Sequence, residues 1–140
     1  MTYYDIINGI KDCALEEPNV NYFGHTDVFK LNSEPDINYS VVYVTPNQHT
    51  VTEDNTIYSL NIYYIDRWDD TDSNQLLIQS AAVTVLSNIL NRLNNRYPEL
   101  SIRYNGSITM FYQKFKDLTC GAYLTIQIEV PRIYECEEYE

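Results

Sequence analysis

The chain has 140 residues, of which 44% are hydrophobic and 21% charged, a composition typical of one globular domain rather than of a disordered segment. Its 4 glycines and 5 prolines exclude a collagen-like or linker-rich chain. The formal net charge of −11 argues against a classical nucleic-acid binder, which must neutralise phosphates, and against docking on anionic lipid. The longest apolar runs are a few residues, far short of the ~20 that a membrane span needs, so we expect no membrane contact.

The first predicted element is a helix over Thr2 to Glu17, and Pro18 ends it because the residue before a proline disfavours the helical conformation. Its apolar residues recur at helical spacing: Tyr3, Ile6, Ile7, Ile10, Cys13 and Ala14. Residues 19–38 follow as an irregular arm that contains one short extended piece, Asp27 to Leu31.

A long hairpin comes next. Tyr39 to Thr45 and Thr56 to Asp66 are rich in β-branched and aromatic residues, which favours strands. In the second strand, alternation places four residues on one face: Tyr58, Leu60, Ile62 and Tyr64. The polar segment 45–55 between the strands is predicted to project beyond the sheet as a loop.

In the second half of the sequence, the residue pattern predicts a long helix and a second hairpin. The helix spans Ser73 to Arg96. Its predicted apolar stripe consists of Leu76, Val83, Leu86, Leu90 and Leu93, with Ala82, Val85 and Ile89 beside it. Leu100 to Tyr104 is extended, Asn105-Gly106 is a strong turn signal, and Ile108 to Phe115 is a strand. The last strand, Ala122 to Val130, alternates apolar residues facing the core with polar or tyrosine residues facing outward.

The order of elements is therefore helix, hairpin, long helix, hairpin. Hairpins pair antiparallel, and two amphipathic helices must bury their apolar stripes against the sheet. These patterns predict an α+β two-layer sandwich with a mostly antiparallel four-stranded sheet and both helices on one face. Residues 1–131 form this single domain, with the loop 45–55 projecting from it, and residues 132–140 form an acidic tail.

No motif for catalysis or cofactor binding is found. The three cysteines are widely spaced and form no CxxC pair, which argues against structural zinc. The aspartates 66, 69, 70 and 72 suit a hard cation, but their spacing does not match a calcium loop, and helix capping explains them better. We expect no enzyme activity, no cofactor and no metal. The enzyme alternative would have to use Cys120 or this aspartate cluster.

The distribution of charge and tyrosine predicts contacts between copies. Residues 1–70 hold 3 basic and 12 acidic side chains, whereas the stretch 92–116 holds five basic residues and one acidic residue. Two unlike patches on one chain permit head-to-tail association, which can close a ring. The 14 tyrosines supply apolar area together with a polar tip, which suits interfaces. The candidate interface residues come from the loop, the basic stretch, the last strand and the tail: Thr45, Asn47, His49, Val51, Glu53, Arg92, Arg96, Arg103, Lys114, Lys116, Tyr123, Arg132, Tyr134 and Tyr139.

In architecture, this small acidic chain resembles the tail-terminator and neck-ring proteins of tailed bacteriophages. The strand from Tyr123 to Val130, followed by Pro131 and Cys136, is similar to the end of tail-completion proteins of phages of Bacteroidetes, including the crAss-like group. The resemblance implies a virion structural protein, assembled in the host bacterial cytoplasm. It would form a sixfold or twelvefold homo-oligomeric ring that meets portal, adaptor or other neck and tail ring proteins. Genomic DNA would pass through the channel without sequence-specific binding, and the acidic charge would repel its phosphates.

The acidic charge also suits a second class of protein. An inhibitor or immunity-type protein can use carboxylates to mimic phosphate and occupy the basic cleft of a partner enzyme. One-to-one binding to such an enzyme would distinguish this alternative from a ring.

Overall fold

The computed structural model describes residues 2–25, 39–67, 72–104, 107–112 and 119–131. These segments form two helices and six strands in the following order along the chain: α1 (Tyr3–Leu15), β1 (Tyr22–His25), β2 (Val41–Val51), β3 (Asn55–Arg67), α2 (Asp72–Arg96), β4 (Ser101–Tyr104), β5 (Thr109–Tyr112) and β6 (Thr119–Pro131). The two helices lie within about two residues of their predicted ends. Thr2 caps α1 in a reciprocal capping box with Asp5, which satisfies backbone N–H groups of the first turn.

The sheet has six strands and is mixed, so the prediction of a mostly antiparallel four-stranded sheet was wrong. The order is β1-β2-β3-β6-β4, and β5 also pairs with β6. The strand missing from the prediction is β1, which pairs in parallel with the start of β2. β1 has four residues, with glycine at its third position, too short and too polar to show a strand period in the sequence. It forms because the chain after α1 returns along the edge of β2.

The second correction concerns Asn105-Gly106, which the sequence predicts as a tight turn. β4 pairs antiparallel with residues 126–129 of β6, and β5 pairs antiparallel with residues 120–123. Because β3 occupies the other edge of β6 over its whole length, β4 and β5 lie on the same edge, one after the other. The two strands therefore act as one interrupted edge strand and do not pair with each other.

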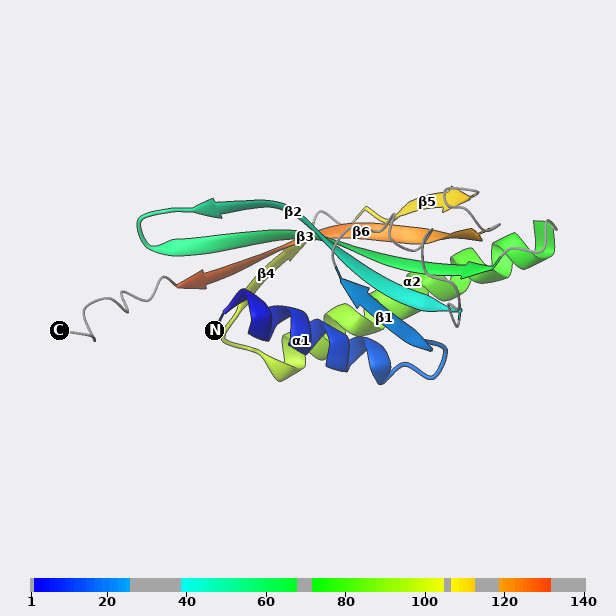
Figure 1. Ribbon diagram of the computed structural model, residues 1–140, viewed down its shortest axis with the longest axis horizontal. Helices are drawn as coiled ribbons and strands as arrows, with labels where there is room; N and C mark the ends of the chain where they lie inside the picture. Colours follow the sequence, from blue (N-terminus) through cyan, green and yellow to red (C-terminus); the bar gives the residue numbers. More distant parts are fainter. Residues whose placement is uncertain (1, 26–38, 68–71, 105–106, 113–118, 132–140) are drawn as a thin grey trace.

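The main core lies between the sheet and the helices, which cover the same face of the sheet (Figure 1). β3 and β6 are in register over 13 residue pairs, and their even-numbered side chains point into this core, as the alternation predicted. α2 contributes its apolar stripe to the same core: Ile78, Ala82, Val85, Leu86, Ile89, Leu90 and Leu93. Burial of this stripe is the main source of stability for both layers.

The outer face of the sheet is divided into two regions. Near the start of β2, a second apolar cluster consists of Val41, Tyr43, Tyr63, Ile65 and Phe111, with Tyr39 and Tyr123 packed against it. Further along β3 and β6 this face is polar. Thr125 donates to Asn61 at 2.6 Å, and Asn55 donates to Glu129 at 2.7 Å. These polar bonds tie β3 to β6 on this face.

The β2–β3 hairpin extends beyond the helix layer (Figure 1). The segment 45–55, predicted as a loop, is for the most part strand: β2 continues to Val51, with a register shift between Pro46 and His49. Thr52 closes the turn, because its N–H donates to the Asn55 carbonyl and its hydroxyl accepts from the Asn55 N–H. The projection is thus a paired ladder of β2 and β3, and β6 pairs with the other side of β3 as far as Pro131.

Candidate functional site

At the hairpin end, two strand edges have no paired neighbour among the described strands. β1 pairs with β2 only through residue 44, so in the part of the chain that the structure describes no strand pairs with the edge of β2 from Pro46 to Val51. β4 is the last strand on the opposite side of the sheet. Open edges present backbone N–H and C=O groups that can pair with another strand. Four candidate interface residues line the β2 edge or its tip and are exposed: Asn47, His49, Val51 and Glu53.

The turn fixes which backbone groups of β2 point out of the sheet. Because the Thr52 N–H bonds to the Asn55 carbonyl, hydrogen-bonded positions alternate from there, and Thr50 is the next one. Val51 and His49 occupy the intervening positions, whose backbone groups point away from β3. Their N–H and C=O groups are therefore directed at the open edge, ready to pair with a further strand.

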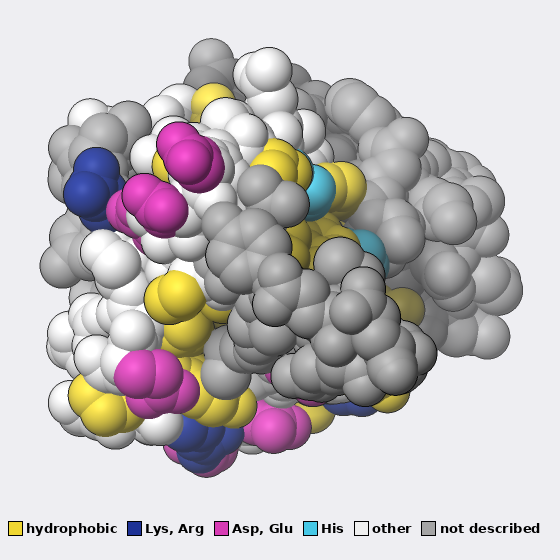
Figure 2. All heavy atoms as spheres, turned by 90° about the vertical axis from the view of Figure 1, so that its left-hand side faces the viewer, with side chains coloured by type: hydrophobic (Ala, Val, Ile, Leu, Met, Phe, Trp, Pro, Cys, Tyr) yellow, Lys and Arg dark blue, Asp and Glu magenta, His cyan; other side chains and the backbone are white. Residues whose placement is uncertain are grey.

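The side chain of His49 is held beneath the hairpin by aromatic contacts. The Tyr3 ring lies 4.9 Å from the His49 ring and 5.4 Å from the Tyr58 ring, centroid to centroid. The Tyr3 hydroxyl hydrogen-bonds to Nε2 of His25 at 2.9 Å. Figure 2 views this end and shows histidine side chains beside hydrophobic ones, with acidic side chains on the same face. The cluster of Tyr3, His25, His49 and Tyr58 fastens the start of α1 to the hairpin.

This cluster gives a pH prediction. Burial lowers the pKa of His25 from its usual 6.5, so the folded chain holds the proton less readily than the unfolded chain. The stability that His25 contributes is present above pH 6.5 and is lost as the pH falls through its lower folded-state pKa. We expect the urea midpoint to fall between about pH 7.5 and 5.5 more steeply in the natural chain than in His25→Gln. Asp66, whose pKa burial raises, acts with opposite sign but is common to both proteins. Parallel pH profiles would contradict the prediction.

Arg92 and Arg96, predicted as interface residues, form ion pairs within the chain. Arg92 contacts Glu17 at 2.9 Å and Glu16 at 3.4 Å, and it also donates to the Cys13 carbonyl at 3.4 Å. Arg96 pairs with Glu16 and, at 4.0 Å, with Asp12. These contacts join the end of α2 to the end of α1. The basic stretch of the sequence is therefore partly neutralised by the acidic N-terminal part of the same chain.

The other described candidates lie on the sheet. Arg103 of β4 is 72% exposed and lies 3.5 Å from Glu129, on the polar outer region. Tyr123 is half-buried and stacks on Tyr63 with a centroid distance of 4.9 Å. Thr45 is half-exposed, at the base of the hairpin. The remaining candidates lie outside the described residues: Lys114, Lys116, Arg132, Tyr134 and Tyr139.

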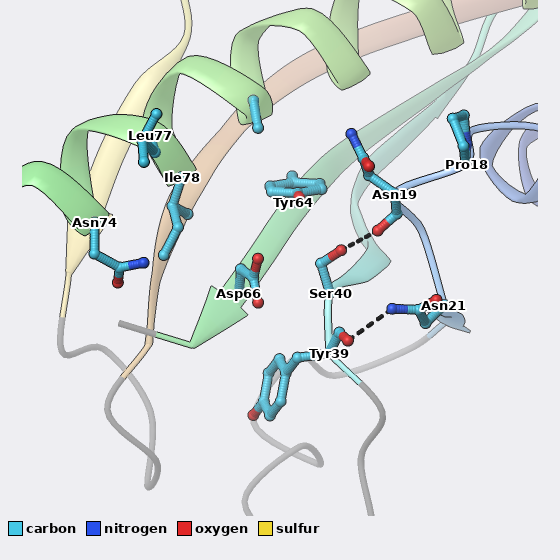
Figure 3. Close-up of a pocket in the computed structure, with 11 residues that line it drawn as sticks. Pro18, Asn19, Asn21, Tyr39, Ser40, Tyr64, Asp66, Asn74, Leu77 and Ile78 are labelled. Atoms are coloured by element: carbon cyan, nitrogen blue, oxygen red, sulfur yellow. Dashed lines mark hydrogen bonds between the residues drawn. The ribbon is translucent and has the colours of Figure 1, made fainter. Parts of the chain in front are cut away.

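Sequence reasoning missed a polar pocket at the opposite end of the sheet from the hairpin tip. The cavity is about 470 Å³ and lies between the first half of α2, the end of β3 and the segment joining α1 to β1. Figure 3 shows the carboxylate of Asp66 among the lining residues, with Ile78 and Asn74 of α2 to its left. The phase of β3 was the available signal: Tyr58, Leu60, Ile62 and Tyr64 face the core, and Asp66 is the next residue on that face. We had grouped Asp66 with the aspartates that follow it.

The two described cysteines lie in the core. Cys13 and Cys120 are buried free thiols, and burial together with Asp66 raises the pKa of Cys120 to about 11. A thiol with so high a pKa is a poor nucleophile near neutral pH. Within the described ranges, no group of three His, Cys, Asp or Glu side chains could hold a metal ion. Asp69 and Asp70 of the aspartate cluster lie outside those ranges.

One described helix is long and apolar enough to cross a membrane by length and composition. This segment of α2, Asn74–Arg96, has a mean hydropathy of 1.3, a value that the core helices of water-soluble proteins also reach. Its apolar stripe packs on β3 and β6, although Leu76 and Leu77 are each 69% exposed.

No protein-family model matches the chain, and no curated protein matches it.

Proposed function

We propose that the chain is a structural subunit of a homo-oligomeric ring in the neck or tail of a tailed bacteriophage, which joins portal or head-completion proteins to the tail around the DNA channel. The observation that carries the proposal is the hairpin end of the sheet, where two different open edges flank a projecting ladder. The family resemblance of the sequence supports the virion setting. The charge split no longer carries the proposal, because Arg92 and Arg96 are used within the chain.

The strand directions favour a closed ring. At the hairpin end the order is β2-β3-β6-β4, and each strand is antiparallel to the next. β4 therefore runs opposite to β2. If neighbouring copies point their hairpins the same way, β4 of one copy meets β2 of the next as an antiparallel pair. Such a contact joins two unlike surfaces, and its repetition gives a ring with all hairpins on one side when the rotation between copies closes on the first copy.

Substitution of Val51 by proline tests this contact. Val51 is 66% exposed, and its N–H points away from β3, so the change removes an outward donor and leaves the hairpin ladder intact. We expect association to weaken about tenfold or more while the urea midpoint stays close to that of the natural chain. Sedimentation velocity over a concentration series measures the association. Urea unfolding followed by circular dichroism measures the midpoint.

The matched control is Val51→Thr, which keeps the N–H and the branched Cβ and should associate as the natural chain does. If Val51→Pro is folded and associates as strongly as Val51→Thr, the β2 edge is not the contact.

The second candidate function is that of an acidic inhibitor of a basic partner enzyme. The ion pairs of Arg92 and Arg96 favour it because they remove positive charge from the surface. Asp12, Glu16 and Glu17 neutralise Arg92 and Arg96. Outside these ion pairs, carboxylates stay exposed on the described surface at the start of α1 and at the hairpin tip: Asp5, Glu53 and Asp54. A monomer that binds a basic protein in a one-to-one complex, with loss of binding at high salt, would establish this alternative.

A further inference from the structure

We propose that the pocket around Asp66 binds an alkylammonium group, either the side chain of a lysine in another protein or a free polyamine, with Asp66 as its counter-ion. This site is separate from the sheet edges of the hairpin end. The proposal does not depend on the ring.

Asp66 lies near the end of β3, on the side of the strand that faces the core. Its neighbours on the same face of β3 are core residues, and across the ladder it is paired with the buried Cys120. A carboxylate there lies at the end of the apolar layer, where α2 covers the sheet. Arg67, the next residue, points to the opposite face and lies over the Tyr39 ring at 5.4 Å, so it does not neutralise Asp66.

The charge of Asp66 is unpaired among the described residues. Its one hydrogen bond there is to the backbone N–H of Arg67, at 2.7 Å to Oδ1. Burial raises the pKa of this carboxyl, whereas that hydrogen bond lowers it. A half-buried carboxylate without a cation is costly, and a bound cation removes that cost.

The rest of the lining selects the class of cation. One carboxylate is too few for Ca²⁺ or Mg²⁺, which require several oxygen ligands at fixed geometry. None of the described residues that line the cavity is basic, so among them an anionic group would meet the repulsion of the Asp66 carboxylate. Leu77, Ile78, Ala81 and Pro18 form apolar walls along which an alkyl chain can pack. An ammonium group on an aliphatic chain fits this lining, because the chain can pack on the apolar walls while the ammonium pairs with the Asp66 carboxylate.

The hydrogen bonding of Asp66 favours ammonium over guanidinium. A guanidinium binds a carboxylate best through two parallel hydrogen bonds, one to each oxygen. Oδ1 of Asp66 already accepts from the Arg67 N–H, which leaves Oδ2 as the better acceptor. A lysine-type ammonium needs only one such oxygen.

The test is an NMR titration of the full chain at neutral pH with n-pentylamine, 1,5-diaminopentane and doubly capped lysine, and with capped norleucine as the uncharged control. The readouts are the Asp66 carboxyl carbon and the amides of Tyr64 and Ile78. We expect saturable shifts with the amines, none with norleucine, and a loss of affinity of about tenfold or more in Asp66→Asn. Asp54→Asn at the hairpin tip is the matched control and should bind as the natural chain does.

The ligands also distinguish the sources. Tighter binding of the diamine indicates a free polyamine, and tighter binding of capped lysine indicates a protein side chain. Leu77→Ala removes an exposed wall residue without entering the core and should weaken pentylamine, so the proposal stays testable if Asp66→Asn unfolds. Equal binding by Asp66→Asn and Asp54→Asn, or no saturable shift with any amine, would overturn the proposal.

Discussion

Gly121→Ala is expected to destabilise the fold more than any other single change considered, by about 3 kcal/mol or more. A Cβ at this position would lie 1.8 Å from the carbonyl oxygen of Tyr64, which belongs to the neighbouring strand. The obstacle is backbone of the 13-pair β3–β6 ladder, in which Gly121 is paired with Ile65, so it cannot move aside without breaking ladder pairs. Urea unfolding followed by circular dichroism measures the loss.

Gly9→Ala is the matched control. Its Cβ would meet the Tyr97 ring at 2.7 Å, a side chain that can rotate, and alanine is the better helix former by about 1 kcal/mol. We expect the two effects nearly to cancel. If Gly121→Ala costs no more than Gly9→Ala, the close approach of β3 and β6 is not as described.

Arg92→Met is expected to cost about 3 kcal/mol. Glu17, its partner at 2.9 Å, is only 6% exposed, so loss of the guanidinium leaves a buried carboxylate without a counter-charge. The change also removes the contact with the Cys13 carbonyl, at the end of α1. When Glu17→Gln is added to Arg92→Met, the double variant should recover more than half of the lost stability, since the second change removes the unpaired charge. Urea denaturation of the two single variants and the double variant completes a double-mutant cycle.

Arg96→Met serves as the comparison for Arg92. Its partners Asp12 and Glu16 are far more exposed, and exposed ion pairs contribute less than about 1 kcal/mol. Equal losses for the two arginines would contradict the role assigned to the buried carboxylate of Glu17.

The sequence predicted an element correctly where a regular alternation of apolar and polar residues extends over many residues of one helix or strand. The α1 stripe and the alternation of β3 and β6 were predicted because each side chain repeats its environment over many residues. The α2 stripe was predicted only in part, because Leu76 and Val83 are 69% and 37% exposed. The four-residue β1 was missed because its parallel pairing with β2 is a long-range contact that leaves no local pattern. The turn at Asn105-Gly106 was over-interpreted, since a turn signal does not say which strand the following residues pair with.

The candidate sites likewise depend on contacts between elements that lie far apart in the sequence. The basic stretch looked like a surface patch because the sequence does not show that α1 places Glu16 and Glu17 beside Arg92. Asp66 was assigned to the aspartates that follow it in the chain, whereas the phase of β3 places it on the core face. Charge counts along a chain therefore predict surface properties only after the ion pairs between its elements are known.

The most direct test of the ring is native mass determination at high protein concentration, with particle images from the same sample, for the natural chain and Val51→Pro. The account predicts closed rings of six or twelve copies of the natural chain, with all hairpins on one side, and their loss in Val51→Pro. A natural chain that stays monomeric at the highest soluble concentration, or rings that persist unchanged in Val51→Pro, would contradict it.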